Sequence, residues 1–313
     1  MMWMWILGLV AVLVAAGAVF VWLLTRKAQS PRQLPNENKP GVPYEEVGWT
    51  SGGQPIRGWF LPQPNASASE PGPAIVVAHG WGSNRSRVLR YAGPLHEAGF
   101  AVLLYDVRAH GDSGPHRAPS GLLFYQDIEA AIAWLNRRPD VDAARIGVLG
   151  HSLGAFGAVL ALDAGVPIAA LVTDAMPVRF ATMVEAELRR RRLPAFPLAQ
   201  MIPQVMVWRS GIPRRVMKRA DPARILADNA RGRRVPTLHI HSRGDDFIPP
   251  TELDHVLSRT PTLSHLFVDV EGHSASERDP AFWGTVIPFF RNQLSAQKKA
   301  GLQAIRPQAQ RLY

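Results

Sequence analysis

The 313-residue chain contains no cysteine. This absence excludes disulfide scaffolds, iron–sulfur clusters, thiolate zinc sites and a cysteine nucleophile. Charged residues are few, at 19%, and acidic residues are scarcer than basic ones, with 25 Asp and Glu against 35 Lys and Arg. Hydrophobic residues make up 47% of the chain, which excludes a disordered chain, a collagen-like repeat and a multi-span membrane protein. The length is sufficient for one large domain or two small ones, each with a buried core.

The amino-terminal segment differs from the rest of the chain. Residues 2–24 carry no charge, and a helix of that length would be about 35 Å long, enough to cross the hydrocarbon core of a bilayer. Tryptophans stand near both ends of this run, as at a membrane interface, and Arg26 and Lys27 end it. We therefore expect a transmembrane helix that anchors the protein, over residues 1–27. The alternative is a signal peptide cleaved near residues 16–18, but no basic segment precedes the apolar run.

The charges that flank the apolar segment predict its orientation. Four basic residues, Arg26, Lys27, Arg32 and Lys39, follow it, whereas only the amino terminus is charged before it. By the positive-inside rule, we expect a single-pass protein of the cell membrane with its folded domain in the cytoplasm.

Two other segments lack any periodic pattern of apolar residues. Residues 28–41 contain three prolines together with polar residues, which predicts an extended linker. Residues 297–313 are polar and basic, and we expect a loosely ordered polar tail there. The folded domain is then expected over residues 42–296.

Strand-like and helix-like patterns alternate through that domain. Eight short β-rich runs occur, and most from the third onward are almost wholly apolar, as in parallel strands covered on both faces. Helical patterns cover residues 87–98, 122–136, 152–163 and 280–294. This alternation predicts the α/β class, with a doubly wound, mostly parallel, eight-stranded sheet. The expected strands are residues 44–50, 56–61, 74–78, 101–105, 146–149, 169–173, 237–241 and 266–270.

The fifth expected strand leads directly into Gly-His-Ser-Leu-Gly at residues 150–154, which opens a helix. Ligands of doubly wound sheets bind beyond the carboxyl ends of the strands. A sharp turn from strand to helix needs small residues on either side, and it would raise the hydroxyl of Ser152 above the sheet, next to a helix N-terminus. We therefore expect Ser152 to be a nucleophile, and the alternative is an ordinary N-cap serine.

A serine nucleophile needs a base, and the base needs a carboxylate that orients it. Among the ten histidines, His273 follows the last expected strand in a Gly-His-Ser turn, at the edge of the sheet that carries Ser152. The seventh strand ends at the same edge, in a loop with two adjacent acids, Asp245 and Asp246. The place of these acids relative to Pro249 favours Asp245, and Asp246 is the alternate. Ser152, Asp245 and His273 are thus the expected catalytic residues, in that chain order.

Backbone amides must also stabilise the charge that develops on the substrate oxygen. The third strand ends in His-Gly-Trp-Gly-Ser at residues 79–83, where glycines allow the backbone to approach closely. We expect the amides of Trp81 and Leu153 to form this oxyanion hole. The polar loop after the fourth strand is expected to be structural, with Asp106 and Arg108 tying loops together beneath the site.

Taken together, four motifs resemble those of the α/β-hydrolase superfamily over residues 42–294. Within it, the chain is similar to the bacterial serine hydrolases described as serine aminopeptidase-like or lysophospholipase-like. The resemblance implies an α/β-hydrolase fold, a serine nucleophile, acyl-enzyme chemistry and no metal or organic cofactor. Ser242 and Ala109 stand where the family commonly has glycine. The four motifs are His-Gly-Trp-Gly at 79–82, Asp-x-Arg-x-His-Gly-x-Ser at 106–113, Gly-His-Ser-Leu-Gly at 150–154, and Asp245 with Gly272-His273.

An insert between the sixth and seventh strands, residues 177–236, carries the whole excess of positive charge. It holds 14 Arg and Lys against four acids, whereas the rest of the chain is balanced. Its helical patterns are amphipathic, and we expect a helical cap over the strand ends. Basic amphipathic helices on an anchored protein indicate contact with anionic lipid headgroups. The alternative is a solvated cap, and nucleic-acid binding is disfavoured because aromatics are not interleaved with the charges.

These features lead to one expected function and two alternatives. The expected function is a membrane-anchored serine hydrolase of carboxylic esters or thioesters, with the acyl chain of the substrate, for example a lipid, under the cap. A peptidase acting on small amides, similar to a serine aminopeptidase, is the first alternative, although few carboxylates are available to bind a substrate amine. A non-catalytic scaffold that retains the fold is the second.

Overall fold

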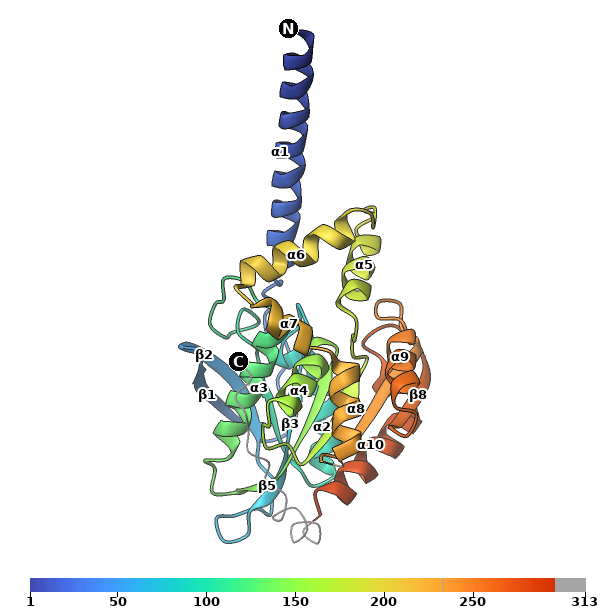
Figure 1. Ribbon diagram of the computed structural model, residues 1–313. Coiled ribbons are helices and arrows are strands. Elements are labelled where there is room, and N and C mark those ends of the chain that lie inside the picture. Colours follow the sequence, from blue (N-terminus) through green and yellow to red (C-terminus); the bar gives the residue numbers. More distant parts are fainter. Residues whose placement is uncertain (233, 296–313) are drawn as a thin grey trace.

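The computed structural model describes residues 1–232 and 234–295, and its centre is one eight-stranded sheet (Figure 1). The strand order is β1-β2-β4-β3-β5-β6-β7-β8. β2 pairs antiparallel with β1 and β4, and all other neighbouring strands pair parallel. The prediction of a doubly wound, mostly parallel, eight-stranded α/β sheet is confirmed. The strands are β1 (Glu45–Ser51), β2 (Gln54–Leu61), β3 (Gly72–Ala78), β4 (Ala101–Tyr105), β5 (Val141–His151), β6 (Ala170–Asp174), β7 (Thr237–Gly244) and β8 (Ser264–Glu271).

Helices cover both faces of the sheet. Alternate strand residues point to opposite sides, so Val76 in β3 belongs to the core cluster that includes residues of α3, α4, α8 and α9, whereas Val77 belongs to the cluster that includes residues of α2 and α10. Burial on both faces explains why the central strands are almost wholly apolar. The helices are α1 (Met2–Ala28), α2 (Leu89–Glu97), α3 (Gly121–Leu135), α4 (Leu153–Asp163), α5 (Phe180–Arg190), α6 (Leu198–Ser210), α7 (Arg214–Arg219), α8 (Pro222–Gly232), α9 (Thr251–Arg259) and α10 (Pro280–Gln293), with short 3₁₀ helices η1 (Arg85–Val88) and η2 (Ser276–Arg278).

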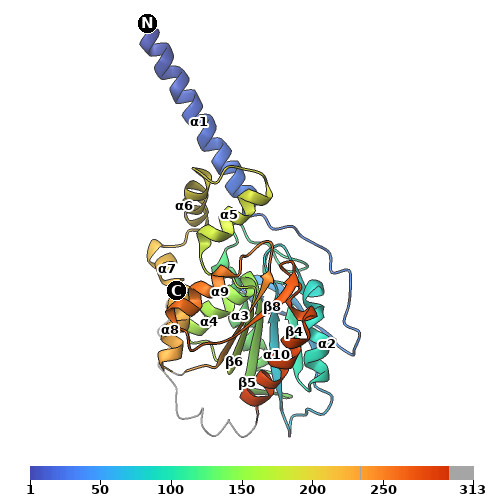
Figure 2. The same ribbon diagram turned by 90° about the vertical axis from the view of Figure 1, so that its right-hand side faces the viewer.

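Helix α1 leaves the body and extends away from it, on the side of α5 and α6 (Figure 2). Within the described residues it is the one helix long and apolar enough to cross a membrane, with a mean hydropathy of 2.7 in its most apolar window. Only 6% of that window is buried, so α1 is not a core helix of the domain. The amino-terminal helix is therefore a candidate membrane span.

The segment after α1 is extended, but it is held against the body. Residues 29–44, which include most of the expected linker at residues 28–41, contain no helix or strand. Asn36 donates from Nδ2 to carboxylate oxygens of Asp106 and Asp112, each at 2.9 Å. These bonds fix the segment beside the loop that follows β4. The expected polar tail, residues 297–313, lies outside the described residues.

The insert at residues 177–236 divides into two parts. Helices α5 and α6 stand beyond the carboxyl ends of the strands (Figure 1), whereas α8 packs against α4 and α9 with Ile225 and Leu226 in the main core. Two adjacent parallel strands need a crossover through a helix on the sheet, and α8 supplies it between β6 and β7. We call the part formed by α5 to α7, residues 180–219, the cap.

Candidate active site

The turn between β5 and α4 carries Ser152 in a strained conformation. Its φ is 54° and its ψ is −121°, a combination that costs free energy and persists only where the surroundings impose it. A Cβ on Gly150 would lie 2.5 Å from the Cα of Ala155, and a Cβ on Gly154 would overlap the carbonyl oxygen of Ala78. Both flanking glycines are therefore required for this turn, which presents the serine hydroxyl at the carboxyl end of the central strand.

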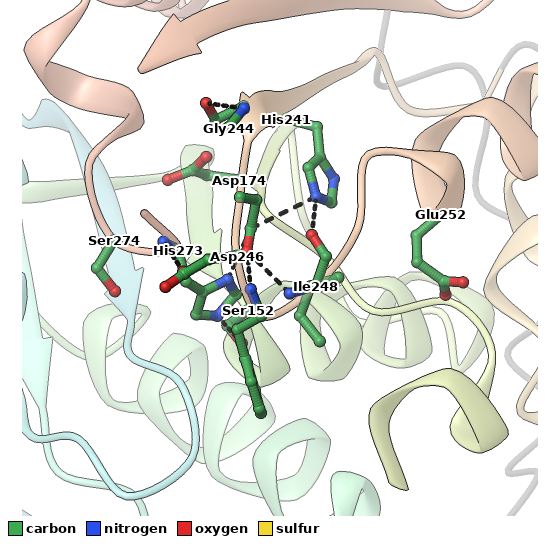
Figure 3. A network of polar contacts seen from close by, with 12 residues as sticks. Ser152, Asp174, His241, Gly244, Asp246, Ile248, Glu252, His273 and Ser274 are labelled. Carbon is green, nitrogen blue, oxygen red and sulfur yellow. Dashed lines mark hydrogen bonds and ion pairs between the residues drawn. The ribbon is translucent and has the colours of Figure 1, made fainter. Parts of the chain in front are cut away.

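His273 reaches Ser152 from the loop after β8. Its Nε2 lies 2.9 Å from the Oγ of Ser152, although the two residues are 121 positions apart in the chain (Figure 3). The preceding Gly272 has a φ of 95°, in the left-handed region that glycine adopts without strain. The chain turns at this residue, between β8 and His273. The fold thus brings together the hydroxyl and the imidazole that the sequence singled out.

Of the two adjacent acids, Asp245 lies against the imidazole. Its Oδ2 accepts from His273 Nδ1 at 2.7 Å, while its Oδ1 accepts from the amides of Phe247 and Ile248 at 2.9 and 2.8 Å. Asp246 accepts instead from the backbone amide of His273, at 3.2 Å. With Asp245 ionised, Nδ1 of His273 carries the proton and Nε2 is free to accept one from the serine. This hydroxyl–imidazole–carboxylate series is the arrangement of base-activated serine nucleophiles.

A second histidine, His241 on β7, supports the carboxylate of Asp245. Its Nε2 donates to the carbonyl oxygen of Ile248 at 2.8 Å and lies 3.5 Å from Asp245 Oδ2. Burial alone would raise the pKa of Asp245, but the bonds from His241, His273 and the amide of Phe247 outweigh it and hold that pKa well below its usual range. Sequence reasoning did not identify His241, because a histidine within an apolar strand gives no signal of which loop it supports.

The turn after β3 lies against the serine. A Cβ on Gly80 would lie 2.9 Å from the Cβ of Ser152, so only glycine permits this contact. His79 ties the turn to the β4 loop, because its Nδ1 donates to the carbonyl oxygen of Gly80 at 2.7 Å and its Nε2 accepts from the amide of Val107 at 3.0 Å. Burial lowers the pKa of His79 to about 4, so the ring stays neutral and keeps both bonds. Trp81 follows in this turn.

Leu153, the second expected amide donor, is the first residue of α4. Its backbone N–H is therefore one of the unpaired donors at a helix N-terminus, where negative charge is stabilised. The amides of Trp81 and Leu153 thus flank Ser152, one in the turn that touches it and one directly after it in the chain.

A buried network on the other side of His273 escaped the sequence analysis. Tyr91 donates its hydroxyl to Asp174 Oδ2 at 2.6 Å, and His151 Nδ1 contacts the same oxygen at 3.2 Å. His151 Nε2 lies 3.1 Å from the hydroxyl of Ser274, the residue after His273, and Figure 3 shows Asp174 and Ser274 near the site. Burial lowers the pKa of His151 to about 4, so its ring is neutral at neutral pH. The network fixes the loop that carries His273.

The polar loop after β4, which the sequence analysis expected to tie loops together, is bonded to η1 and to α3. Asp106 accepts from the amide of Arg85 at 2.7 Å and pairs with its guanidinium at 2.5 Å. Arg108 pairs with Asp127 on α3, with Nε 2.7 Å from Oδ1. Ala109 has a φ of 65°, which explains why glycine suits this position.

A buried acid anchors the start of the cap. Glu252 on α9 accepts from the amides of Val178 and Arg179 through Oε2, both at 2.7 Å, and pairs with the Arg179 guanidinium through Oε1. At the other end of α5, the guanidinium of Arg190 lies 5.4 Å from the ring of Phe247. That ring in turn lies 5.3 Å from the imidazole of His273. The cap therefore reaches the rim of the site.

In the part of the chain that the structure describes, no group of three or more His, Asp or Glu side chains is arranged to hold a metal ion. The polar groups at the site bond instead to one another, as described above.

Comparison with curated relatives finds proteins of similar sequence without a described activity. An uncharacterised protein of Mycobacterium tuberculosis is 35% identical over 168 residues, which cover 52% of this chain and 58% of that protein. The uncharacterised protein YqkD of Bacillus subtilis is 26% identical over 204 residues, 64% of each chain. The match thus spans little more than half the length of the first of these relatives.

Comparison with solved structures and family models identifies the fold. An esterase of Pyrococcus furiosus superposes with a TM-score of 0.66 at 20% identity, covering 85% of this chain and 98% of that chain. Est1E of Butyrivibrio proteoclasticus, with ferulic acid bound, gives 0.61 at 15% identity, covering 80% and 99%. These identities indicate likeness of fold. A family model described as the alpha/beta hydrolase family matches residues 75–309, most of the chain. The chain belongs to the alpha/beta hydrolase family.

Proposed function

We propose that the protein is a serine hydrolase that cleaves carboxylic esters or thioesters through an acyl-enzyme. The observation that carries this proposal is the unbroken series of bonds from Ser152 Oγ to His273 at 2.9 Å and from His273 to Asp245 at 2.7 Å. Membership of the hydrolase family and the likeness to esterase structures support it. The narrower resemblance, to the serine aminopeptidase-like or lysophospholipase-like branch, remains part of the prediction.

In the proposed reaction, the proton moves along this series. His273 Nε2 accepts the proton of Ser152 as Oγ attacks the acyl carbonyl, and ionised Asp245 stabilises the imidazolium that forms. His273 then protonates the leaving alcohol or thiol. Water, deprotonated by the same imidazole, attacks the acyl-enzyme and releases the acid, which restores the serine.

The negative charge of the tetrahedral intermediate would be held by two backbone amides. Trp81 and Leu153 are the proposed donors, because one lies in the turn that touches Ser152 and the other opens α4. Each such donor is typically worth about 3–4 kcal/mol of transition-state stabilisation. His79 is a positioning residue in this proposal, since it fixes the carbonyl oxygen of Gly80 and hence the direction of the next amide.

The charges of the cap favour an ester substrate over an aminopeptidase substrate. A peptidase that binds a free amino terminus needs an unpaired acid near the site, as a partner for the substrate's ammonium group. The cap holds two acids, and Glu187 is paired with Arg190 and Arg191, so only Glu185, exposed on α5, is left in the cap for this role. An amide substrate with a charged amine is thus the less favoured candidate.

The membrane location also belongs to the proposal. Helix α1 would cross the cell membrane once, and the basic residues after it favour a cytoplasmic location of the folded domain. Reporter fusions at both ends of the full chain test this topology.

Hydrolysis assays test the proposed function. The full chain in detergent should hydrolyse p-nitrophenyl acyl esters, and much more slowly aminoacyl p-nitroanilides. Ser152→Ala should abolish ester hydrolysis, whereas Ser264→Ala, an exposed serine on β8, should leave it unchanged. Faster cleavage of the anilides would favour the peptidase, and equal activity of Ser152→Ala and the wild-type chain would contradict the proposal.

A further inference from the structure

The carboxyl-terminal part of α1 is packed against α6 of the cap. Val21 is buried among apolar residues of α5 and α6, and the ring of Trp22 lies 5.6 Å from that of Trp208. The side chain of Gln29 donates to the hydroxyl of Ser210 at 2.8 Å, and Arg209 donates to Gln29 Oε1 at 2.8 Å. The cap is therefore joined to the end of the candidate span by both apolar and polar contacts.

The length of the exposed part of α1 fixes where a bilayer would end. Residues 2–20 are all exposed, and at 1.5 Å per residue they are about 28 Å long. The hydrocarbon core of a bilayer is about 30 Å thick. The first buried residue, Val21, is also where packing against the cap begins. A bilayer crossed by α1 would thus have its hydrocarbon boundary at the level of α6.

Helix α6 and the residues before it expose apolar side chains at this level. Outside residues 1–28, the described residues expose only three large hydrophobic side chains, and all three are here: Phe196, Met201 and Trp208, at 77%, 41% and 72% exposure. Exposed aromatic side chains are expensive in water and favourable at a membrane interface. The rest of the body leaves no comparable apolar surface in the described part of the chain.

The charges around α6 also suit a membrane surface. Arg26 and Lys27 are exposed at the end of α1, and residues 189–192, four consecutive arginines, are exposed at the end of α5. The guanidinium of Arg209 lies over the ring of Trp22, at 5.2 Å from its centroid. Basic side chains beside interfacial aromatics bind anionic headgroups.

We propose that α6 lies in the headgroup interface of the bilayer that α1 crosses, with Phe196, Met201 and Trp208 inserted. The cap over Ser152 is thereby held against the membrane, and acyl substrates reach the serine from the lipid phase. The inference rests on the proposed hydrolase function only for this last step. The contact of Arg190 with Phe247, beside His273, places the rim of the site on the same side as the bilayer.

The absence of cysteine gives a direct test, because single-cysteine variants carry one label each. Full-length Phe196→Cys and Met201→Cys, labelled with nitrobenzoxadiazole, are reconstituted in phosphatidylcholine and phosphatidylglycerol vesicles that contain nitroxide-labelled acyl chains. Val10→Cys in α1 is the membrane control, and Asn136→Cys, exposed after α3, is the water control. The labels at 196 and 201 should be quenched clearly more than the label at 136, although less than the label at 10, because the interface lies farther from the bilayer centre.

Several outcomes would overturn this inference. Quenching at 196 and 201 no stronger than at 136, with strong quenching at 10, would place α6 in water. Labels that are shielded from water but not quenched by lipid would mean that a protein partner covers α6. A label at 10 that is not quenched would remove the span on which the inference depends.

Enzyme assays separate this inference from the proposed function. The double variant Phe196→Ser with Met201→Ser should lose about tenfold in kcat/KM on a long-chain ester embedded in vesicles, but less than about twofold on a short soluble ester. Equal losses on both substrates, or none on the embedded ester, would contradict delivery from the lipid phase. A wild-type chain inactive on both esters would contradict the proposed function alone, and the quenching data would still decide the position of α6.

Discussion

The body and the cap differ in how their charged side chains are paired and in how much apolar surface they expose. In the body, two fully buried acids are bonded to cations, Asp106 to Arg85 and Asp127 to Arg108, and a third, Asp174, is bonded to Tyr91 and His151. In the cap, four arginines at residues 189–192 are exposed, together with large apolar side chains around α6. Buried charge must be paired to be tolerated, and exposed apolar surface indicates a partner. The body thus pairs its buried polar groups internally, whereas the cap exposes basic and apolar side chains together.

The proposed function of the site depends on which of the two adjacent acids, Asp245 or Asp246, touches the imidazole. Asp245→Asn should lower kcat for ester hydrolysis by about 10⁴-fold, because an amide can neither hold the tautomer of His273 nor stabilise its charge. Asp246→Asn should cost far less, since Asp246 accepts only from the backbone amide of His273. Steady-state kinetics on a p-nitrophenyl ester measures both. A loss in Asp246→Asn as large as that in Asp245→Asn would exchange their roles.

The difference between body and cap should also affect how stability depends on pH. Burial lowers the pKa of His79 and His151 to about 4 and of His110 and His239 to about 3, all in the body, whereas the cap contains no histidine. Because these pKa values lie below the ordinary value of about 6.5, the unfolded chain binds more protons, and stability falls as pH decreases from about 6.5 toward 4. Each such histidine contributes up to about 1.4 kcal/mol per pH unit. His241, whose pKa is raised, opposes them in part.

Thermal unfolding of the full chain in detergent, followed by circular dichroism from about pH 7.5 to about pH 5, checks this effect. The Tm should fall on acidification, and His239→Gln should reduce the slope. His239 is fully buried and lies outside the contacts of Ser152, so this variant leaves the site in place. A Tm that is constant or higher at low pH would contradict the claim that buried neutral histidines make the body less stable in acid.

Glu252 on α9 connects the body to the start of the cap. Glu252→Gln removes the charge that holds the amides of Val178 and Arg179 and the Arg179 guanidinium, at an expected cost of about 1–3 kcal/mol. The start of α5 should loosen, so trypsin should cleave faster at the arginines of residues 189–192. Asp254→Asn, exposed on the same helix, is the matched control and should leave the cleavage rate unchanged. Equal cleavage rates in both variants would mean that Glu252 does not anchor the cap.

The smallest expected effect concerns the backbone of the body. Ala109 has a φ of 65°, where a residue with a Cβ is strained, so Ala109→Gly should raise the free energy of unfolding by roughly 0.5–1 kcal/mol. Ala164→Gly, at a position with a φ of −74°, is the control and should lower it. Urea denaturation measures both changes. Destabilisation by Ala109→Gly similar to that by the control would show that the strain is absent.

The fold was largely predictable from the sequence, because sheet strands and their ends follow from local patterns. Short β-rich runs marked all eight strands, and Ser152, Asp245 and His273 each follow the end of one of them. The carboxyl ends of parallel strands meet at one edge, so residues far apart in the chain were expected to converge there. Local patterns plus this single rule of topology were sufficient for the geometry of those three side chains.

Supporting contacts were not predictable in the same way. The contacts of His151 with Asp174 and Ser274 join three separate segments, and their geometry depends on side-chain directions that no local pattern encodes. Asn36 stands in a segment without apolar periodicity, which gave no sign that it would bond to Asp106. The crossover role of α8 was hidden because its amphipathic pattern is the same whether the helix covers a sheet or belongs to a cap.

The most direct test of the central claim is to locate the residue that a fluorophosphonate probe modifies in the full chain, by mass spectrometry of its peptides. The account predicts one adduct on Ser152, formed at least about 10³-fold more slowly in His273→Ala because the serine then lacks its base. An adduct on another residue, or equal rates in His273→Ala and the wild-type chain, would contradict the claim that Ser152 is activated by His273 and Asp245.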